Sequence, residues 1–170
     1  GDVSGEAMKY LGVDPSSFTG LVLLDGDVPT PKLVNFKKKS GFERVQLIAK
    51  SVGSLLDEWK PDLIAIEGYA YGNSNSLVTL VEIGTVIRRE FYIRGIPWYD
   101  VPPTVLKKWV TGKGNAKKPD MAMAALDKWG FALTQDDIVD AYCLARILEA
   151  VDKGLVNVSS MKGVVRNDPV

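Results

Sequence analysis

Four acidic residues stand at the ends of elements that the sequence predicts. Asp14 ends the first apolar run of the chain, and Glu67 ends a later run at residues 63–66. Asp137 and Asp140 lie at the start of the last expected helix. If the two apolar runs are neighbouring strands, Asp14 and Glu67 lie side by side at their carboxyl ends, the edge where sites form in sheets with parallel strands. The four carboxylates are therefore candidate metal ligands.

The angular positions on the last helix support this interpretation. At about 100° per residue, Asp137 and Asp140 each lie roughly 30° from the centre of the apolar stripe, whereas Asp136 lies roughly 70° away. Two acids beside an apolar stripe are costly unless positive charge meets them. Ligation by oxygen alone suits Mg²⁺ or Mn²⁺.

Each acid also has an ordinary explanation. An Asp before Pro-Ser-Ser is typical of a turn, as at Asp14. A Glu at a strand end is commonly a solvated terminus, and the helix dipole favours acids in a first helical turn without any function. Only the convergence of all four acids at one sheet edge separates the metal site from these alternatives.

The composition excludes several kinds of catalysis. The chain has 170 residues, enough for one domain with a sizeable core. It has no histidine, which excludes Ser-His-Asp hydrolysis, histidine-ligated zinc and nucleases with a histidine base. Its single cysteine, Cys143, excludes an internal disulfide and a cysteine-rich metal site. We expect Cys143 to be an inert buried thiol and the compartment to be a reducing cytoplasm.

The charges balance overall but are separated along the chain. The 21 basic and 21 acidic residues exclude a globally basic nucleic-acid binder. Residues 104–120 nevertheless carry five lysines against one acid, and residues 134–152 carry five acids against one arginine. A lysine segment beside an acidic cluster suits a polyanion that is cut with the help of metal ions, although a solvated helix face explains the lysines equally well. A further cluster, Lys37, Lys38 and Lys39, is expected to be solvent exposed.

Hydrophobic periodicity and turn residues predict an α/β domain at residues 8–153. Three short strands in an antiparallel meander precede alternating helices and strands, so we expect a mixed five-stranded sheet with helices on both faces. Residues 1–7 and 154–170 are expected to be mobile termini. The expected strands are 8–13, 21–24, 32–36, 63–66 and 97–101, and the expected helices are 40–59, 77–93, 104–110, 119–129 and 136–153.

Four segments of the chain resemble the motifs of a known nuclease family. Leu11-Gly12-Val13-Asp14-Pro15, Ala65-Ile66-Glu67 and Asp137-Ile138-Val139-Asp140-Ala141 are similar to the three acidic motifs of RuvC-type Holliday junction resolvases, which belong to the ribonuclease H-like superfamily. Thr111-Gly112-Lys113-Gly114-Asn115-Ala116-Lys117-Lys118 resembles that family's Gly-x-Gly-x-Ala-x-Lys segment. The resemblance runs from about Lys9 to Ala150 and implies a ribonuclease H-like fold. Ser16, where the family usually has glycine, and the zero net charge indicate a divergent member of phage type.

The resemblance also implies roles for individual residues. Asp14, Glu67, Asp137 and Asp140 would be catalytic and would hold two Mg²⁺ ions, for which Mn²⁺ could substitute. Lys118 would contact the scissile phosphate or orient the water, with Lys117 as the fallback. An aromatic residue after the second motif stacks on bases at the junction centre in this family, although packing at a strand end explains a tyrosine equally well. The expected DNA-contacting residues are Lys107, Lys108, Lys113, Lys117, Tyr69 and Tyr71.

The helix at residues 77–93 carries more apolar residues than one core-facing stripe needs. Members of the family form dimers through this region, so we expect a homodimer that contacts its partner here. Trp98, Trp109 and Trp129 have spacings typical of core residues. Polar residues interrupt every apolar run well short of a membrane span, so no membrane partner is expected.

Together these observations predict a Mg²⁺-dependent endonuclease of branched DNA in a bacterial or phage-infected cell. The expected substrate is the four-way (Holliday) junction, and a two-metal reaction would leave 5′-phosphate and 3′-hydroxyl ends. Two alternatives stay open. One is a broader structure-selective nuclease that acts on forks, flaps or RNA–DNA hybrids, and the other is a non-catalytic junction-binding protein.

Overall fold

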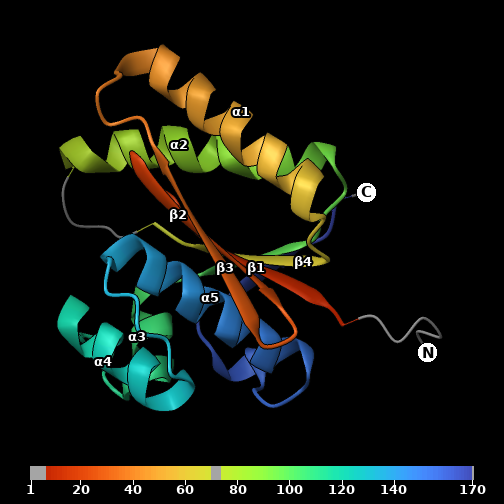
Figure 1. The fold of residues 1–170 in the computed structure, drawn as a ribbon, viewed down its shortest axis with the longest axis vertical. Coiled ribbons are helices and arrows are strands. Elements are labelled where there is room, and N and C mark those ends of the chain that lie inside the picture. The colour runs from red at the N-terminus through yellow and green to blue at the C-terminus, as the bar shows by residue number, and fades with distance from the viewer. Residues whose placement is uncertain (1–6, 70–73, 170) are drawn as a thin grey trace.

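The computed structural model describes residues 7–69 and 74–169 and shows one mixed sheet with helices on both faces (Figure 1). The strands lie in the order β3-β2-β1-β4-β5-β6. β1, β4 and β5 are parallel to one another, and β2, β3 and β6 are antiparallel to their neighbours. The elements are β1 (Lys9–Asp14), β2 (Phe18–Asp25), β3 (Val28–Asn35), α1 (Gly41–Trp59), β4 (Leu63–Glu67), α2 (Ser74–Ile93), β5 (Trp98–Val101), α3 (Pro103–Thr111), α4 (Lys118–Trp129), α5 (Asp136–Asp152), the 3-10 helix η1 (Val158–Ser160) and β6 (Val165–Asn167).

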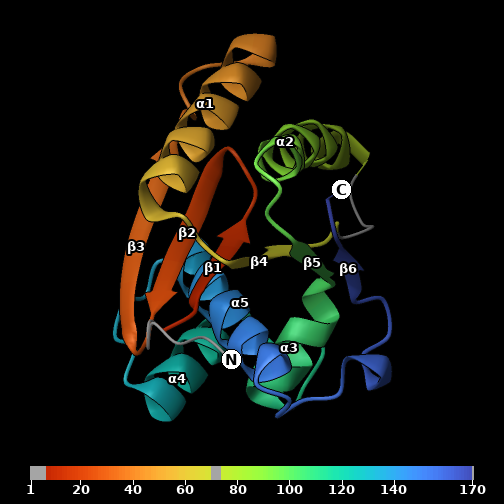
Figure 2. The ribbon, with the colours of Figure 1, turned by 90° about the vertical axis from the view of Figure 1, so that its right-hand side faces the viewer.

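The two faces of the sheet bury separate apolar cores. Along β1, Tyr10 packs on the side of α3, α4 and α5, whereas Leu11 and Val13 pack on the side of α1 and α2 (Figure 2). This alternation follows from the two-residue period of a strand. The predicted α/β class and the placement of helices on both faces are confirmed.

The aromatic residues and the cysteine lie where the sequence predicts them. Trp98 is buried in the core beneath α1 and α2. Trp109 and Trp129 stack with ring centroids 5.7 Å apart and pack against the opposite core. Cys143 is fully buried in that core, and burial raises the pKa of its thiol to about 12, so the thiol stays protonated and unreactive.

The sheet has six strands rather than the predicted five, and the sixth lies within residues 154–170, which were expected to form a mobile terminus. Residues 165–167 form a sixth strand that pairs antiparallel with β5, so that Trp98 faces Asn167 and Asp100 faces Val165. A strand of three residues is too short to show an alternating pattern, and tertiary pairing supplies what the sequence lacks.

β2 and β3 are longer than the sequence predicts, whereas β1 has the predicted length and is shifted by one residue. β3 spans Val28–Asn35 rather than residues 32–36, although it contains Pro29 and Pro31. It is an edge strand, where the missing N–H groups of proline can face away from the ladder. Because proline usually argues against a strand, the sequence did not predict the first half of β3.

Within the described residues, no helix is both long and apolar enough to cross a lipid bilayer.

Helix α5 lies unusually close to the backbones of β1 and β2. A Cβ atom at Gly12 would overlap the carbonyl oxygen of Ala141, and one at Gly20 would overlap the carbonyl oxygen of Asp137. Glycine inside a strand often marks such an approach of two backbones. Residues 138–148 of α5 are buried almost without interruption, as expected of a helix seated this deeply.

We predict that Gly12→Ala lowers the free energy of unfolding by about 2 kcal/mol or more, because the added methyl group meets backbone that cannot move aside. Gly114→Ala is the control, since the nearest atom to its Cβ would lie 3.5 Å away and its backbone needs no glycine. Denaturant unfolding of the two variants measures the difference. Equal stabilities would contradict the close approach.

Candidate functional site

Asp14 and Glu67 lie side by side at the carboxyl ends of β1 and β4. The strands pair in parallel with Val13 opposite Ile66, so the next residue of each strand occupies the same edge of the sheet. Val13 and Ile66 are buried beneath α1 and α2. Strand alternation then directs Asp14 and Glu67 to the opposite face, where α5 lies.

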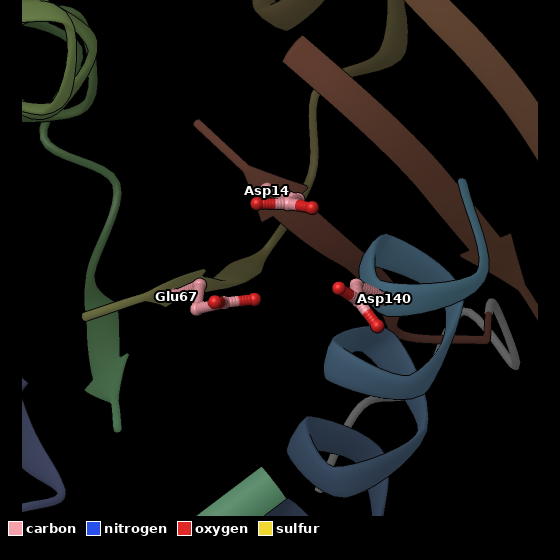
Figure 3. A group of neighbouring side chains, drawn as sticks. All are labelled: Asp14, Glu67 and Asp140. Carbon is pink, nitrogen blue, oxygen red and sulfur yellow. The ribbon is translucent and has the colours of Figure 1, made fainter. Parts of the chain in front are cut away.

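Helix α5 adds a third carboxylate to this pair. The carboxylate oxygens of Asp14, Glu67 and Asp140 include one from each residue that lie within 4.8 Å of one another, and all three residues are half-buried. Figure 3 shows the three side chains converging from two strands and one helix. The predicted convergence at the sheet edge is therefore present for these three acids.

Asp137 and Asp136 occupy different positions at the start of α5. Asp137 lies beside Asp14, whose carboxyl group donates a hydrogen bond to it when protonated, but Asp137 lies outside the group of three. Asp136 is exposed and forms an ion pair with Lys118, with 3.3 Å between Nζ and Oδ2. The helical angles predicted this difference, since they place Asp137 nearer to the apolar stripe than Asp136.

Burial and mutual repulsion raise the pKa values of the clustered acids. The pKa of Asp14 lies well above its ordinary value, because of burial first and then the charges of Glu67, Asp140 and Asp137. Burial and Asp140 raise the pKa of Glu67 to about 8, and burial and Asp137 raise that of Asp140 to about 6. Burial also raises the pKa of Asp137. Bringing these carboxylates together in ionised form is costly without a cation.

The chemistry of this group fits a divalent metal ion. All its donors are carboxylate oxygens, which suit Mg²⁺ and Mn²⁺. Among the residues that the structure describes, no lysine or arginine forms an ion pair with Asp14, Glu67 or Asp140. A solvated strand end or a helix dipole would explain one exposed acid, but not three half-buried acids that face one another.

Two of the predicted lysines act on the acidic cluster through their charge. Lys107 of α3 and Lys118 of α4 both lower the pKa values of Glu67 and Asp140, and Lys107 has the larger effect on each. The sequence placed Lys118 nearest to the chemistry because of its motif. It gave no means of ranking Lys107, since the approach of α3 to the cluster depends on the fold.

The other predicted lysines lie farther out. Lys108 and Lys113 border a surface hollow of about 600 Å³ between α3 and α4. Lys117 is exposed at the start of α4, where its backbone N–H donates to Asp120. The Lys37–Lys39 cluster is exposed, as predicted, and Lys39 pairs with Glu43 of α1.

Tyr69 borders the acidic cluster, whereas Tyr71 lies outside the described residues. Tyr69 lines a hollow of about 140 Å³ together with Asp14, Ser16 and Glu67. Its hydroxyl accepts a hydrogen bond from Arg88, which the sequence did not single out. An arginine within a helical pattern is an ordinary surface residue by sequence, so nothing signalled this contact.

Ser16 takes part in the turn that follows Asp14. Its hydroxyl donates to the carbonyl of Phe18 at 2.6 Å and accepts from the N–H of Phe18 at 3.0 Å. A serine turn of this kind fixes the backbone by side-chain hydrogen bonds. The residue that departs from the family pattern thus supports the local structure beside Asp14.

Sequence comparison matches most of the chain to one family. The model of the family described as crossover junction endodeoxyribonuclease RuvC matches residues 10–160. Curated relatives carry the same name, among them proteins of Prochlorococcus marinus and Syntrophomonas wolfei. That of Prochlorococcus marinus is 28% identical over 149 residues, covering 81% of this chain and 94% of the relative. That of Syntrophomonas wolfei is 29% identical over 153 residues, covering 81% and 86%.

Structure comparison finds the same fold in solved resolvases. The chain is similar to Thermus thermophilus RuvC in complex with a Holliday junction substrate, with a TM-score of 0.69 at 21% identity, covering 81% of this chain and 90% of that one. It is also similar to the yeast mitochondrial Holliday junction resolvase, with a TM-score of 0.53 at 13% identity, covering 89% and 87%.

We predict that metal-free protein loses stability through the acidic cluster as the pH rises. The folded protein holds protons on these acids that the unfolded chain, with carboxyl pKa values near 4, has released, so the free energy of unfolding falls between about pH 4 and pH 8. Asp14→Asn should therefore unfold at a higher temperature than the wild type at pH 8 in EDTA, and this difference should shrink towards pH 4.

Added Mg²⁺ should raise the unfolding temperature of the wild type more than that of Asp14→Asn. Asp127→Asn, at an exposed position of α4, is the control and should follow the wild type under all conditions. Thermal unfolding followed by circular dichroism measures both effects. An Asp14→Asn protein that is less stable than the wild type at pH 8 in EDTA would contradict the repulsion.

Proposed function

The chain belongs to the RuvC family of crossover junction endodeoxyribonucleases, and on this premise we propose that it resolves four-way DNA junctions by metal-dependent hydrolysis of phosphodiesters. The observation that carries the proposal is the group of three half-buried carboxylates, Asp14, Glu67 and Asp140, inside the matched residues. A non-catalytic junction-binding protein would have no use for these acids, whose repulsion raises their pKa values.

Asp14, Glu67 and Asp140 would hold the metal, with Asp137 completing the set from the helix start. We propose Mg²⁺ as the cation, with two ions in each site and Mn²⁺ as a substitute. When bound, two such ions would supply positive charge that stabilises the leaving oxygen and would lower the pKa of the attacking water. The products would carry 5′-phosphate and 3′-hydroxyl ends. No histidine is needed, and the chain has none.

Lys107 and Lys118 would contact the phosphates nearest the cut. Both act on the acids through their charge, and Lys118 is held at the edge of the site by Asp136. A phosphate that approaches the cluster meets these cations before it meets the carboxylates, which offsets repulsion between two anions. Lys108, Lys113 and Lys117, which lie farther from the acids, would contact the DNA backbone beyond the cut.

The aromatic residues after Glu67 would contact bases at the junction centre. Tyr69 lies beside the acids, so a base that leaves its stack near the cut could pack against its ring. Tyr71 is proposed for the same role from its sequence position alone. The curated relatives named above are bacterial, which supports a bacterial or phage-infected cell as the setting.

We further propose that two copies associate through α2. Ile83, Ile87 and Phe91 face the core, whereas four apolar residues on the other side of the helix are exposed. At about 100° per residue these four share one face. They are Val78, Val81, Tyr92 and Ile93. Two sites related by a two-fold axis could then cut both strands of a symmetric junction.

The nuclease domain was predicted at residues 8–153, and we propose that it extends to include β6. β6 completes the sheet, and Asn167 donates a hydrogen bond from its side-chain amide to Asp100 of β5 at 2.8 Å. We therefore expect a chain that ends at residue 153 to be less stable than the full chain.

Single-turnover cleavage in Mg²⁺ tests the proposed function. The wild type should cut four-way junctions faster than forks, flaps, RNA–DNA hybrids or linear duplexes. Asp14→Asn and Asp137→Asn should each lower this rate by at least about a hundredfold, as expected when a ligand of a working metal is lost, while gel-shift binding of the junction persists.

Asp136→Asn is the matched control, because it changes the neighbouring acid, which is exposed and paired with Lys118. It should change the rate by less than about tenfold, since the charge lost adds only a small effect at a helix start. Wild-type turnover in excess EDTA would refute the metal site. Faster cutting of forks or hybrids than of four-way junctions would favour the broader nuclease.

The proposed dimer is tested by placing a charge on the exposed face of α2. Val81→Glu should produce monomers at micromolar concentration and uncouple the nicks on the two strands, because a carboxylate cannot be buried unpaired in an apolar interface. Val28→Glu makes the same substitution at an exposed valine of β3, and this variant should stay dimeric. Sedimentation velocity separates the two outcomes, and a monomeric wild type would rule out the interface.

A further inference from the structure

The loop between β3 and α1 carries the longest run of consecutive basic residues in the chain. Lys37, Lys38 and Lys39 are all exposed, and residues 36–44 contain four basic residues against one acid. Because the chain has no net charge, its attraction for a polyanion must come from local groups of this kind. The loop is therefore a candidate for contact with DNA, as the lysine-rich segment at residues 104–120 is.

The strand pairings place this loop at the same edge of the sheet as the acids. Asp14 of β1 lies opposite Gly20 of β2, and Phe18 of β2 lies opposite Asn35, the last residue of β3. The carboxyl ends of β1 and β3 therefore share one edge, and Lys37 follows two residues after Asn35. In Figure 1 the loop lies at the same end of the sheet as the start of α5.

The sheet geometry gives the approximate distance between the loop and the acids. β2 lies between β1 and β3, so two strand spacings of about 4.8 Å separate β3 from β1 by about 10 Å. Lys37 lies a few residues beyond the level of Asp14, which adds about 10 Å along the strand direction at about 3.3 Å per residue. The lysines therefore lie about 15 Å from the acids, which corresponds to about four or five base pairs along a DNA duplex.

Lys37 is held against the turn between β1 and β2. Its ammonium nitrogen lies 5.2 Å from the centre of the Phe18 ring, within the range of a cation–π contact. The N–H of Phe36 donates to the carbonyl of Ser17, and the N–H of Lys39 donates to the carbonyl of Phe36. These contacts fasten the loop to the turn. A lysine that is already positioned loses less conformational entropy when it binds a phosphate.

The three lysines differ in their charge partners. Lys39 forms an ion pair with Glu43 at 3.4 Å, but both side chains are more than half exposed, so this pair contributes little. Within the part of the chain that the structure describes, Lys37 and Lys38 form no ion pair. The loop therefore keeps the charges of these two lysines available for an anion.

The two lysine-rich segments lie on opposite sides of the acids. In the sheet order β3-β2-β1-β4-β5, the loop follows β3 on one side, and α3 with Lys107 follows β5 on the other. Asp14 and Glu67 end β1 and β4, which lie between them. A DNA strand whose phosphate lies at the acids extends in both directions from the cut. Each direction therefore meets one group of lysines.

We propose that the loop at residues 36–39 is a second DNA-backbone contact, in which Lys37 and Lys38 bind phosphates of the duplex arm on the β3 side of the cut. The proposal rests on the proposed nuclease function and adds a separate surface to it. Phosphates are recognised there by charge, so the contact does not depend on base sequence. The surface holds one arm of the junction in a fixed direction relative to the acids.

The salt dependence of junction binding tests the charge of this surface. The full-length wild type and Lys37→Gln/Lys38→Gln are titrated with a four-way junction in Ca²⁺ at several salt concentrations, and binding is followed by fluorescence anisotropy. Each phosphate contact adds about 0.9 to the steepness with which log K falls against log salt. The variant should therefore reduce this steepness by about 2 and bind at least about tenfold more weakly in about 0.1 M salt.

The matched control removes two lysines from the far ends of α1 and α5. Lys60 and Lys153 are exposed and directly follow the last residues of these helices, about 25 Å from their starts. Lys60→Gln/Lys153→Gln makes the same change of charge and should keep the salt dependence and the affinity of the wild type. Equal losses in the two double variants would overturn the surface, because they would show an effect of net charge alone.

Neutral methylphosphonate linkages locate the contact on the DNA. They replace phosphates one at a time along each arm of the junction, and the cut is mapped separately in Mg²⁺. Binding of the wild type should weaken at linkages about three to six base pairs from the cut on one arm. Lys37→Gln/Lys38→Gln should be insensitive to these linkages and stay sensitive to those next to the cut. Equal sensitivity of both proteins at every linkage would overturn the assignment to this arm.

The outcomes separate this surface from the proposed function. A wild type that cuts junctions, with the same salt dependence in all three proteins, would retain the nuclease and refute the surface. A wild type that cuts no branched DNA in Mg²⁺, but whose salt dependence falls when Lys37 and Lys38 are replaced, would retain the surface as a DNA contact and refute the nuclease.

Discussion

The close contact between α5 and the backbones of β1 and β2 determines where the acids of this protein meet. Gly12 and Gly20 permit it, because a side chain at either position would overlap the helix backbone. At Gly20 the strand backbone approaches the backbone of Asp137 itself. The packing of α5 on the sheet therefore also fixes the position of this acid. Asp140 follows one turn later and lies against Asp14 and Glu67.

This placement creates an electrostatic problem that the fold alone does not solve. Burial and repulsion raise the pKa values of Asp14, Glu67 and Asp140, while Lys107 and Lys118 offset only part of the effect on Glu67 and Asp140. The neutral sum of charges hides this local excess of acid. A divalent cation among these carboxylates would relieve their repulsion, so the proposed metal would stabilise the arrangement that burial and repulsion disfavour.

The sequence predicted the parts of the site that depend on local pattern. A strand that ends in an acid, as at Asp14 and Glu67, and a helical angle, as at Asp140, can be read without knowing the fold. The larger effect of Lys107 could not be predicted, because it depends on how the fold brings α3 near Glu67 and Asp140. β6 was missed for a related reason, since three residues carry no periodicity and its pairing with β5 is set by contacts made across the chain.

Glycine offered a signal that the sequence interpretation did not use. Gly12 and Gly20 lie within apolar strands, where glycine weakens the strand unless another backbone comes close. Reading them as contact points would have placed a helix on β1 and β2 before the structure was known. Arg88 and Asp100, which form an ion pair, offered no such signal. They lie twelve positions apart in different elements, and their sequence context does not distinguish them from other charged residues.

Helix α2 shows how one element can serve three purposes on separate faces. Ile83 and Ile87 fill the core, and the face with Val78 and Val81 is exposed and would contact the second copy proposed above. Arg88 lies between these faces and donates a hydrogen bond to Tyr69 beside the acids. Since a helix rotates by about 100° per residue, successive apolar residues of α2 face different surroundings. An apolar residue of α2 must therefore be judged by its face, and the excess apolar content that predicted a dimer contains both core and surface residues.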